Sequence, residues 1–255
     1  MQGYEPSTYG DRFADVYDDW YPFDAAAEAT VAVIAERARR VAGPILELGI
    51  GTGRLALPLA RQGFDVRGID ASAAMTARLA AKPGADAIAV TVGDMAAVEV
   101  PRRPDEPVAP ACSVVFCASN TFFGILEPGA QAACLGRCRA VLAPGGCVIV
   151  AAFVPPDVPL ADADVTIRSM SVDEVVLSVA RRDPVRQRIE GHYISLTDAG
   201  TRLRPYAIRY ATVAELDDAA ADAGLTLVER WADWSGTPFH DEAADHVSVY
   251  GVVEA

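Results

Sequence analysis

The chain carries little positive charge. It has 22 Lys and Arg residues against 35 Asp and Glu residues, which gives a formal net charge of −13. An acidic surface repels phosphate groups, so this balance argues against nucleic acid or an anionic membrane as the main partner. A neutral or cationic small molecule fits such a surface better. Lys82 is the single lysine, which indicates the codon bias of a GC-rich bacterial genome.

Long apolar runs are also missing. No run approaches the ~20 residues that a membrane-spanning helix needs. The segment Met1–Asp11 is polar and acidic, so it does not look like a secretory signal. These two absences predict a cytoplasmic protein. The 255 residues are enough for one large domain, or for one domain that carries an insertion.

Closely spaced cysteine pairs are absent as well. None of the five cysteines forms the Cys-x-x-Cys spacing that structural zinc sites commonly use. They all lie in apolar segments, which predicts buried free thiols, and we expect no metal site. The cysteines are Cys112, Cys117, Cys134, Cys138 and Cys147.

Helix and strand patterns alternate from about Ala25 to Val154. This alternation predicts a parallel sheet with helices on both of its faces. The expected helices are Ala25–Val41, Arg54–Gln62, Ala73–Ala81 and Pro128–Leu142, and the expected strands are Pro44–Leu48, Phe64–Asp70, Ala87–Val92, Cys112–Cys117 and Cys147–Phe153.

The pattern changes after the fifth strand. Residues from about 163 to 210 are rich in β-branched side chains and Arg, with an alternation of period two, which predicts three or four antiparallel strands. A helix over Val213–Ala223 and strands at Leu225–Trp231 and His246–Val253 then close the chain. We therefore expect residues 1–160 and 211–255 to form an α/β domain, and residues 161–210 to form an inserted antiparallel sheet.

The most informative segment is Ile45–Arg54, which reads ILELGIGTGR. Its strand brings the chain to the carboxyl edge of the sheet, where doubly wound folds bind ligands. Gly49, Gly51 and Gly53 permit positive φ angles and leave no side chain in the way, so a ligand can lie against the backbone.

Two charged residues of this segment reduce the number of ligand classes that fit it. A dinucleotide site favours Gly-x-Gly-x-x-Gly, but Arg54 occupies the last position of that pattern. Glu47 would repel a pyrophosphate, whereas it would favour the ammonium end of an amino-acid ligand.

Further candidates follow at the ends of the next strands. Asp70 is placed to accept both hydroxyls of a ribose, although it is also suited to capping the helix that starts after Ser72. Asp94 and Met95 come directly after the third strand, where a carboxylate reaches an adenine amine and a thioether stacks on the ring. The mixture of small and aromatic residues over Phe116–Gly124 is typical of a cavity lining.

In this order and spacing, the segments resemble the class I S-adenosylmethionine-dependent methyltransferases. The resemblance covers roughly Tyr9 to Phe153 and the last two strands. It implies a seven-stranded Rossmann-like doubly wound sheet with an antiparallel last strand, an N-terminal lid helix and an inserted antiparallel β roof over the acceptor. It also implies S-adenosylmethionine as the cofactor and S-adenosylhomocysteine as its product. The expected cofactor contacts are Tyr9, Glu47, Gly49, Gly51, Gly53, Arg54, Asp70, Ala71, Met75, Asp94, Met95, Cys117 and Ala118.

Within that family, the chain is similar to the small-molecule N- and O-methyltransferases of bacterial antibiotic and amino-sugar pathways. The similarity implies a small-molecule acceptor and a homo-oligomer in which the insertion joins subunits. It assigns catalytic roles to tyrosines of the lid, here Tyr17 and Tyr9. His192 lies in an expected strand of the roof, where it either faces the pocket as a base or has a structural role. An aromatic stripe of the lid that packs against the core explains Tyr17 as well. The expected acceptor contacts are Tyr21, Asn120, Phe122, Phe123, His192 and His240.

Three hypotheses remain open at this point. Some amino-sugar enzymes have a histidine just after the fourth strand, but Phe122 and Phe123 stand there in this chain. Because an amine in its neutral form needs no base, this departure favours an amine acceptor. The second hypothesis is an O- or C-methyltransferase, which a histidine beside the methyl group would favour. The third is a cofactor-binding scaffold with altered or lost methyl transfer.

Overall fold

The computed structural model describes residues 1–156 and 162–252 and contains two β-sheets. The larger sheet has seven strands in the order β10-β11-β5-β4-β1-β2-β3. Strands β1 to β5 run parallel, and β11 is antiparallel to both β5 and β10. This arrangement confirms the predicted Rossmann-like fold. The strands are β1 (Ile45–Leu48), β2 (Val66–Asp70), β3 (Ala89–Val92), β4 (Cys112–Cys117), β5 (Leu142–Phe153), β10 (Leu225–Trp231) and β11 (Asp245–Val252).

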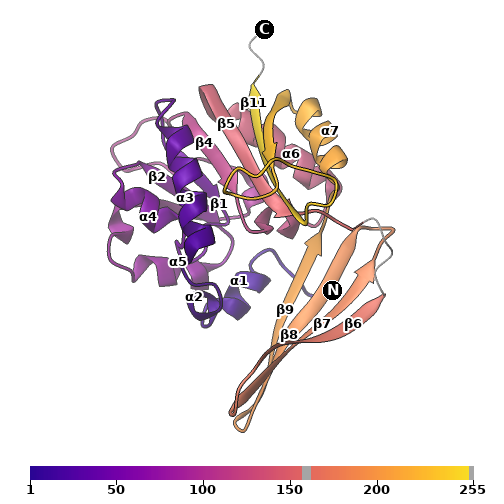
Figure 1. The fold of residues 1–255 in the computed structure, drawn as a ribbon. Helices are drawn as coiled ribbons and strands as arrows, with labels where there is room; N and C mark the ends of the chain where they lie inside the picture. The colour runs from indigo at the N-terminus through magenta and orange to yellow at the C-terminus, as the bar shows by residue number, and fades with distance from the viewer. Residues whose placement is uncertain (157–161, 253–255) are drawn as a thin grey trace.

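Helices cover both faces of this sheet (Figure 1). On one face, α3, α4 and α5 pack on alternate residues of the central strands, such as Ile45, Phe116 and Ile149. On the other face, α6 and α7 pack on the intervening residues, such as Leu46, Val115 and Val148. The two cores follow directly from the alternation of side chains along a strand. The helices are α3 (Ala25–Ala38), α4 (Ala56–Arg61), α5 (Ala73–Ala80), α6 (Pro128–Ala140) and α7 (Val213–Asp222).

The second sheet is an insertion between β5 and α7. Its four antiparallel strands are consecutive along the chain and extend away from the larger sheet (Figure 1). The strands are β6 (Ala163–Met170), β7 (Glu174–Asp183), β8 (Arg188–Thr197) and β9 (Gly200–Arg209). The boundary that we expected at residues 160–161 and the end of the expected strand at Val253 lie outside the described residues.

The expected lid helix is divided into two short helices, α1 (Thr8–Phe13) and α2 (Tyr17–Trp20). Phe13 is fully buried and packs with Met75 of α5, so the lid is anchored in a small core of its own. The ring of Tyr193 from β8 contacts Phe13 and Trp20 edge-on, at centroid distances of 5.8 and 5.6 Å. The lid therefore lies between the larger sheet and the insertion.

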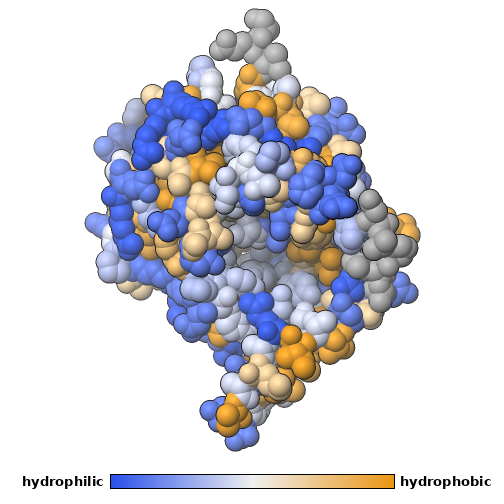
Figure 2. All heavy atoms as spheres, viewed as in Figure 1, coloured by the Kyte–Doolittle hydropathy of each residue, from blue (hydrophilic) through white to orange (hydrophobic). Residues whose placement is uncertain are grey.

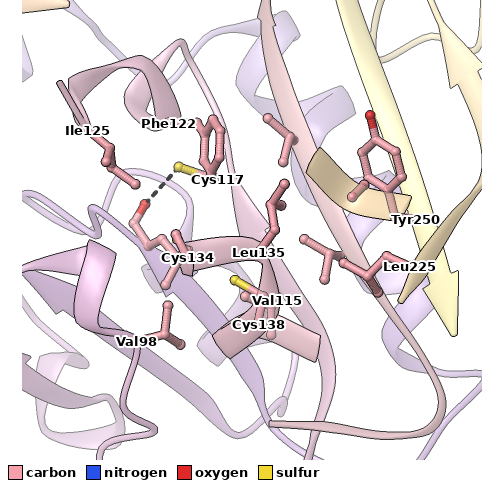
Figure 3. Packing of buried hydrophobic residues seen from close by; sticks show 14 of the residues in the cluster. Val98, Val115, Cys117, Phe122, Ile125, Cys134, Leu135, Cys138, Leu225 and Tyr250 are labelled. Carbon is pink, nitrogen blue, oxygen red and sulfur yellow. Dashed lines mark hydrogen bonds between the residues drawn. The ribbon is translucent and has the colours of Figure 1, made fainter. Parts of the chain in front are cut away.

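The cysteines are free, and four of them are buried. Cys117, Cys134 and Cys138 pack with aliphatic and aromatic side chains between the sheet and α6 (Figure 3). Within the described residues, no group of three or more His, Cys, Asp or Glu side chains is arranged to hold a metal ion. No helix of residues 1–156 and 162–252 is long and apolar enough to cross a membrane.

His246 makes the stability of the fold sensitive to acid. It is buried in β11, where its Nδ1 lies 2.9 Å from Ser248 Oγ. Burial, with a smaller effect of Arg230, lowers the pKa of His246 to about 4. The unfolded chain therefore binds a proton that the folded chain does not, as the pH falls below about 6.5.

We expect the free energy of unfolding to decrease by about 2 kcal/mol between pH 7.5 and pH 5 because of this residue. Chemical denaturation at both pH values measures the change. His246→Gln should remove this part of the pH dependence, whereas His240→Gln, at an exposed loop position, should retain it. An unchanged pH dependence in His246→Gln would show that another group is responsible.

Candidate functional site

The glycine turn after β1 requires glycine for two different reasons. Gly49, Gly51 and Gly53 have φ angles of 71°, 56° and 79°. A Cβ atom at Gly49 would lie 2.3 Å from Thr121 Cγ2, and one at Gly53 would lie 2.4 Å from Leu79 Cδ1. At Gly51, the nearest atom to a Cβ would be 3.9 Å away. Two of the glycines thus allow close packing, and Gly51 leaves a bare backbone surface that a ligand can approach.

Asp70 at the end of β2 holds this turn. Its Oδ2 accepts a hydrogen bond from the Gly51 amide at 2.8 Å, and its Oδ1 accepts one from the Ser72 amide at 2.8 Å. Burial raises the pKa of Asp70, although these two amide donors oppose the shift. Each carboxylate oxygen retains acceptor capacity, so two hydroxyl groups of a ligand can still bind here.

Glu47 on β1 is the most unusual group at the site. It is 6% exposed, and its Oε2 has no hydrogen-bond partner. Burial raises its pKa well above the usual range, although nearby Arg54 opposes the shift. A buried carboxyl oxygen without a partner is costly unless a ligand completes it. An ammonium group is a suitable donor for this position.

Glu47 lines a small cavity together with Gly49, Tyr17 and Arg54. The guanidinium of Arg54 is held by a hydrogen bond from Nη2 to Ser119 Oγ at 2.9 Å. The cavity measures about 20 Å³, and the lid residue Tyr17 is part of its lining.

The three tyrosines of the lid lie close together. Tyr17 contacts Tyr21, with ring centroids 5.0 Å apart, whereas Tyr9 stacks on Phe13 at 4.1 Å. Burial raises the pKa of Tyr17 to about 12, although Arg54 opposes the shift, and burial also raises the pKa of Tyr9 well above its usual range. Both phenols therefore stay protonated near neutral pH and act as hydrogen-bond donors. Of the two, Tyr17 lines the cavity.

The segment after β3 borders the opposite side of the glycine turn. Met95 Sδ would lie 3.9 Å from a Cβ at Gly49, which places the thioether beside the turn. The Asp94 side chain is exposed, and its Oδ1 accepts a hydrogen bond from the Ala96 amide at 2.8 Å. The second oxygen of Asp94 remains available to a ligand.

The remaining expected cofactor contacts differ in exposure. Ala118 lines the cavity, and Ala71 is half-buried beside Asp70. In contrast, Met75 is 2% exposed beneath the lid, and Cys117 is 2% exposed in the core. Cys117 Sγ lies 3.6 Å from the carbonyl oxygen of Leu48, so its thiol points into the protein. Met75 and Cys117 thus belong to the buried layer under the site rather than to its surface.

Phe122 and Phe123 do not face an acceptor pocket. They are 1% and 0% exposed and belong to the same buried cluster as residues of α6. Figure 3 shows Phe122 in this cluster. Asn120 is exposed with a φ of 65°, and its Oδ1 accepts a hydrogen bond from the Phe153 amide at 2.7 Å. The expectation that the aromatic pair binds the acceptor is therefore corrected: a short 3₁₀ helix (Thr121–Gly124) turns both rings inward.

His192 also lies away from the cavity. It is paired with Val179 and Pro205, and its neighbour Tyr193 is the residue of β8 that contacts the lid. Successive side chains of a strand point to opposite faces, so His192 lies on the outer face of the insertion. Its Nδ1 has no hydrogen-bond partner. His240 is exposed and lines neither of the two cavities of the described chain near the lid.

Two acidic residues of the lid have roles that the sequence did not suggest. Asp18 Oδ1 accepts hydrogen bonds from Thr52 Oγ1 at 2.6 Å and from Lys82 Nζ at 2.9 Å, so the single lysine connects the lid to the glycine turn. Asp15 forms a salt bridge with Arg204 of β9 at 2.9 Å. These pairs are separated by many residues in the chain, and neither has a local sequence signal.

The geometry fits one kind of ligand. A bare backbone at Gly51, an acid at the end of β2 and an unpartnered carboxyl oxygen of Glu47 suit a nucleoside that carries an amino-acid ammonium group. S-adenosylmethionine has both parts: Asp70 would hold its ribose and Glu47 its ammonium group, and the cofactor would supply a methyl group on positively charged sulfur. The fold and the site thus define the class of this protein: it has a Rossmann-like fold with a site suited to a nucleoside that carries a sulfonium group.

Comparisons with known proteins agree with this class. A family described as "Methyltransferase domain" matches residues 45–146. The CcbJ methyltransferase from Streptomyces caelestis is 36% identical, with coverage of 98% of this chain and 100% of that one, at a TM-score of 0.88. The chain belongs to the class I S-adenosylmethionine-dependent methyltransferases, and its cofactor is S-adenosylmethionine.

More distant similarities extend this result. CalS10 from Micromonospora echinaspora, an amino pentose methyltransferase seen with S-adenosylmethionine bound, is 22% identical over 92% of this chain and 96% of its own, at a TM-score of 0.67. KedS8 of a Streptoalloteichus species, a sugar N-methyltransferase, is 22% identical over 98% of both chains, at a TM-score of 0.63. At these identities, the likeness shows the fold alone.

An uncharacterized methyltransferase of Geobacillus kaustophilus is 29% identical over 142 residues, or 55% of this chain. The match spans 60% of the length of that curated relative.

Proposed function

We propose that the chain transfers a methyl group from S-adenosylmethionine to an amine of a small molecule. The lining of the cofactor cavity is the observation that carries this proposal. No histidine of the described chain is among its lining residues, and the pKa of Tyr17, about 12, leaves the phenol protonated. A hydroxyl acceptor needs a base at this point, whereas a neutral amine does not. CalS10 and KedS8, with the same fold, act on amino pentose or sugar substrates, and KedS8 is an N-methyltransferase.

The bond changes are simple for this reaction. The cofactor supplies a methyl group on positively charged sulfur. A bond forms between the amine nitrogen and the methyl carbon while the bond from sulfur to that carbon breaks and its electron pair stays on sulfur. The proton of the product ammonium then passes to water. The residues of the chain align the groups and exclude water, which accounts for several kcal/mol of the barrier.

Transfer of a labelled methyl group to paired acceptors tests this proposal. Each pair consists of an amine and the alcohol with the same carbon skeleton. We expect label in the amines and little in the alcohols. Label in the alcohols alone would instead indicate O-methylation, and no label despite cofactor binding in calorimetry would indicate a scaffold. In calorimetry, Asp70→Ala should weaken cofactor binding by roughly 1–3 kcal/mol, because two hydrogen bonds are lost.

We also propose that the chain forms homo-oligomers through the outer face of the insertion. Cross-strand partners share a face of a sheet, and three such rows of β6 to β9 present apolar side chains to solvent. Val165, Ile167, Met170 and Leu203 are 63%, 63%, 70% and 52% exposed. The rows are Val165–Val179–His192–Pro205, Ile167–Leu177–Ile194–Leu203 and Met170–Val175–Leu196–Thr201.

A second copy of the chain is the partner that suits this surface. The three rows lack acidic and basic side chains other than His192, so two such faces can meet without bringing the charges of a −13 protein together. Figure 2 shows hydrophobic residues on the far end of the insertion. Exposed apolar patches of this kind mark association surfaces.

Light scattering after size exclusion tests this association. We expect the wild-type chain to have a multiple of the 26.9 kDa monomer mass. Ile167→Glu should shift the mass toward the monomer, whereas Val228→Glu, at an exposed position of β10, should not. A monomeric wild-type protein at high concentration would contradict the proposal.

A further inference from the structure

A groove lies between the lid and α4, on the other side of Arg54 from the cofactor cavity. Its volume is about 550 Å³, within the range of about 300–1,000 Å³ that is usual for small-molecule sites. Pro22 and Phe23, which follow α2, form one apolar wall, and Leu57 and Pro58 of α4 form the other. Phe23 is 50% exposed, so its ring is accessible to a ligand in the groove.

The charges of this groove oppose those of the whole chain. Arg54, Arg61 and Lys82 line it, against one acid, Asp18. Lys82 and Asp18 neutralise each other in a salt bridge of 2.8 Å. Among residues 1–156 and 162–252, Arg54 and Arg61 have no carboxylate partner within salt-bridge distance. Two guanidinium groups without a salt bridge thus lie at one groove of a protein with a net charge of −13.

Arg54 lies between the groove and the cavity where we propose methyl transfer. It lines the groove and also the cavity that contains Tyr17 and Glu47. Tyr21 lines the groove, and its ring lies 5.0 Å from that of Tyr17 between centroids. A molecule bound along the groove therefore has one end beside the place of methyl transfer.

We propose that the groove binds the acidic part of the acceptor, which carries a carboxylate or phosphate group on an apolar body in addition to its amine. A guanidinium binds either anion through two parallel hydrogen bonds, and apolar walls bury the body of the ligand. The amine then extends past Arg54 to the cofactor cavity. The acceptor has no net positive charge in this case, although the acidic composition of the chain alone favours a neutral or cationic molecule. This inference rests on the proposed amine methylation.

Binding of probes that differ only in their charged group tests the groove separately from catalysis. The probes are 3-phenylpropanoate, 3-phenylpropyl phosphate and 3-phenylpropylamine, titrated in calorimetry with S-adenosylhomocysteine present. We expect at least one of the two anions to bind. The anion that binds with the higher affinity identifies the acidic group of the acceptor. The amine should bind at least fivefold more weakly. Equal binding of the amine, or no binding of either anion, would overturn the proposal.

Variants locate the bound anion. Arg61→Gln should weaken binding of the anionic probe at least fivefold. Phe23→Ala should also weaken this binding, because it reduces the apolar contact with the probe. Arg40→Gln, at an exposed arginine after α3, is the matched control and should bind like the wild-type protein. Wild-type affinity in Arg61→Gln would overturn the assignment.

Methyl transfer distinguishes the two proposals. Label transfer to simple amines, combined with no binding of the anionic probes, would leave the proposed function intact. It would contradict the proposal that the groove binds the acidic part of the acceptor. Binding that depends on Arg61, without transfer to any amine, would overturn the acceptor assignment together with the proposed function. We expect a lower KM for an amine that carries a carboxylate or phosphate than for the same amine without it.

Discussion

Gly49→Ala is expected to weaken S-adenosylmethionine binding at least 100-fold, a loss of about 2.7 kcal/mol. Gly49 has a φ of 71°, which costs an alanine about 1–2 kcal/mol. The added Cβ would also lie 2.3 Å from Thr121 Cγ2. Forcing a methyl group into packed surroundings commonly costs a further 1–3 kcal/mol, so the turn has to move. Movement of the turn displaces the Gly51 amide from Asp70, and we expect both residues to contact the cofactor.

Titration calorimetry measures the affinity, and thermal unfolding shows whether the variant still folds. Gly136→Ala is the matched control, because this glycine lies inside α6 with no atom within 4 Å of a Cβ. It should retain wild-type affinity and gain up to about 1 kcal/mol of stability. Thr121→Ser removes the methyl group of the clash, so the double variant Gly49→Ala/Thr121→Ser should recover part of the affinity. Wild-type affinity in Gly49→Ala would show that the turn tolerates a side chain.

The glycine turn was also the part of the site that the sequence predicted best. Glycines that need positive φ, an acid at the end of the next strand and a buried acid on β1 are local features, and each stands where the pattern places it. The strands of the larger sheet were predicted for a similar reason, because continuous apolar runs such as Cys112–Cys117 leave few alternatives.

Features that depend on distant partners could not be predicted in the same way. The alternation around His192 predicts a strand, but both of its faces carry apolar residues, so the sequence does not say which face meets the lid. Phe122 and Phe123 follow a strand that leads to the site, and only the 3₁₀ turn directs them into the core. Composition gave the single lysine a genomic explanation, whereas its hydrogen bond to Asp18 joins residues that are 64 positions apart in the chain.

That lysine is the basis of the second large effect that we expect. Asp18 and Lys82 connect the lid to the glycine turn, since Lys82 Nζ also donates to the carbonyl oxygen of Thr52 at 2.8 Å. Burial raises the pKa of Asp18, but the hydrogen bonds from Lys82 and Thr52 outweigh it and lower the pKa overall. The carboxylate is therefore ionised at neutral pH, and it links the lid to the glycine turn through Thr52 and Lys82.

Asp18→Ala should lower kcat/KM about tenfold, which corresponds to about 1.4 kcal/mol of transition-state stabilisation. The two charged side chains are 40% and 28% exposed, so solvent screens the pair. Thr52, in contrast, is fully buried, and loss of its bond to Asp18 leaves a hydroxyl without that partner. Lys82→Met should cause a smaller decrease. The double variant should resemble Asp18→Ala alone, because the two residues act through one contact.

Asp18 also lines the acceptor groove, so activity alone does not identify its role. Hydrogen exchange of Thr8–Trp20 provides a direct measure of the lid, and both single variants should exchange faster there. Asp19→Ala is the control, since its side chain is exposed on the same helix and should leave the exchange and the rate unchanged. If Asp18→Ala slowed the reaction without faster exchange in the lid, Asp18 would act on the acceptor in the groove rather than on closure.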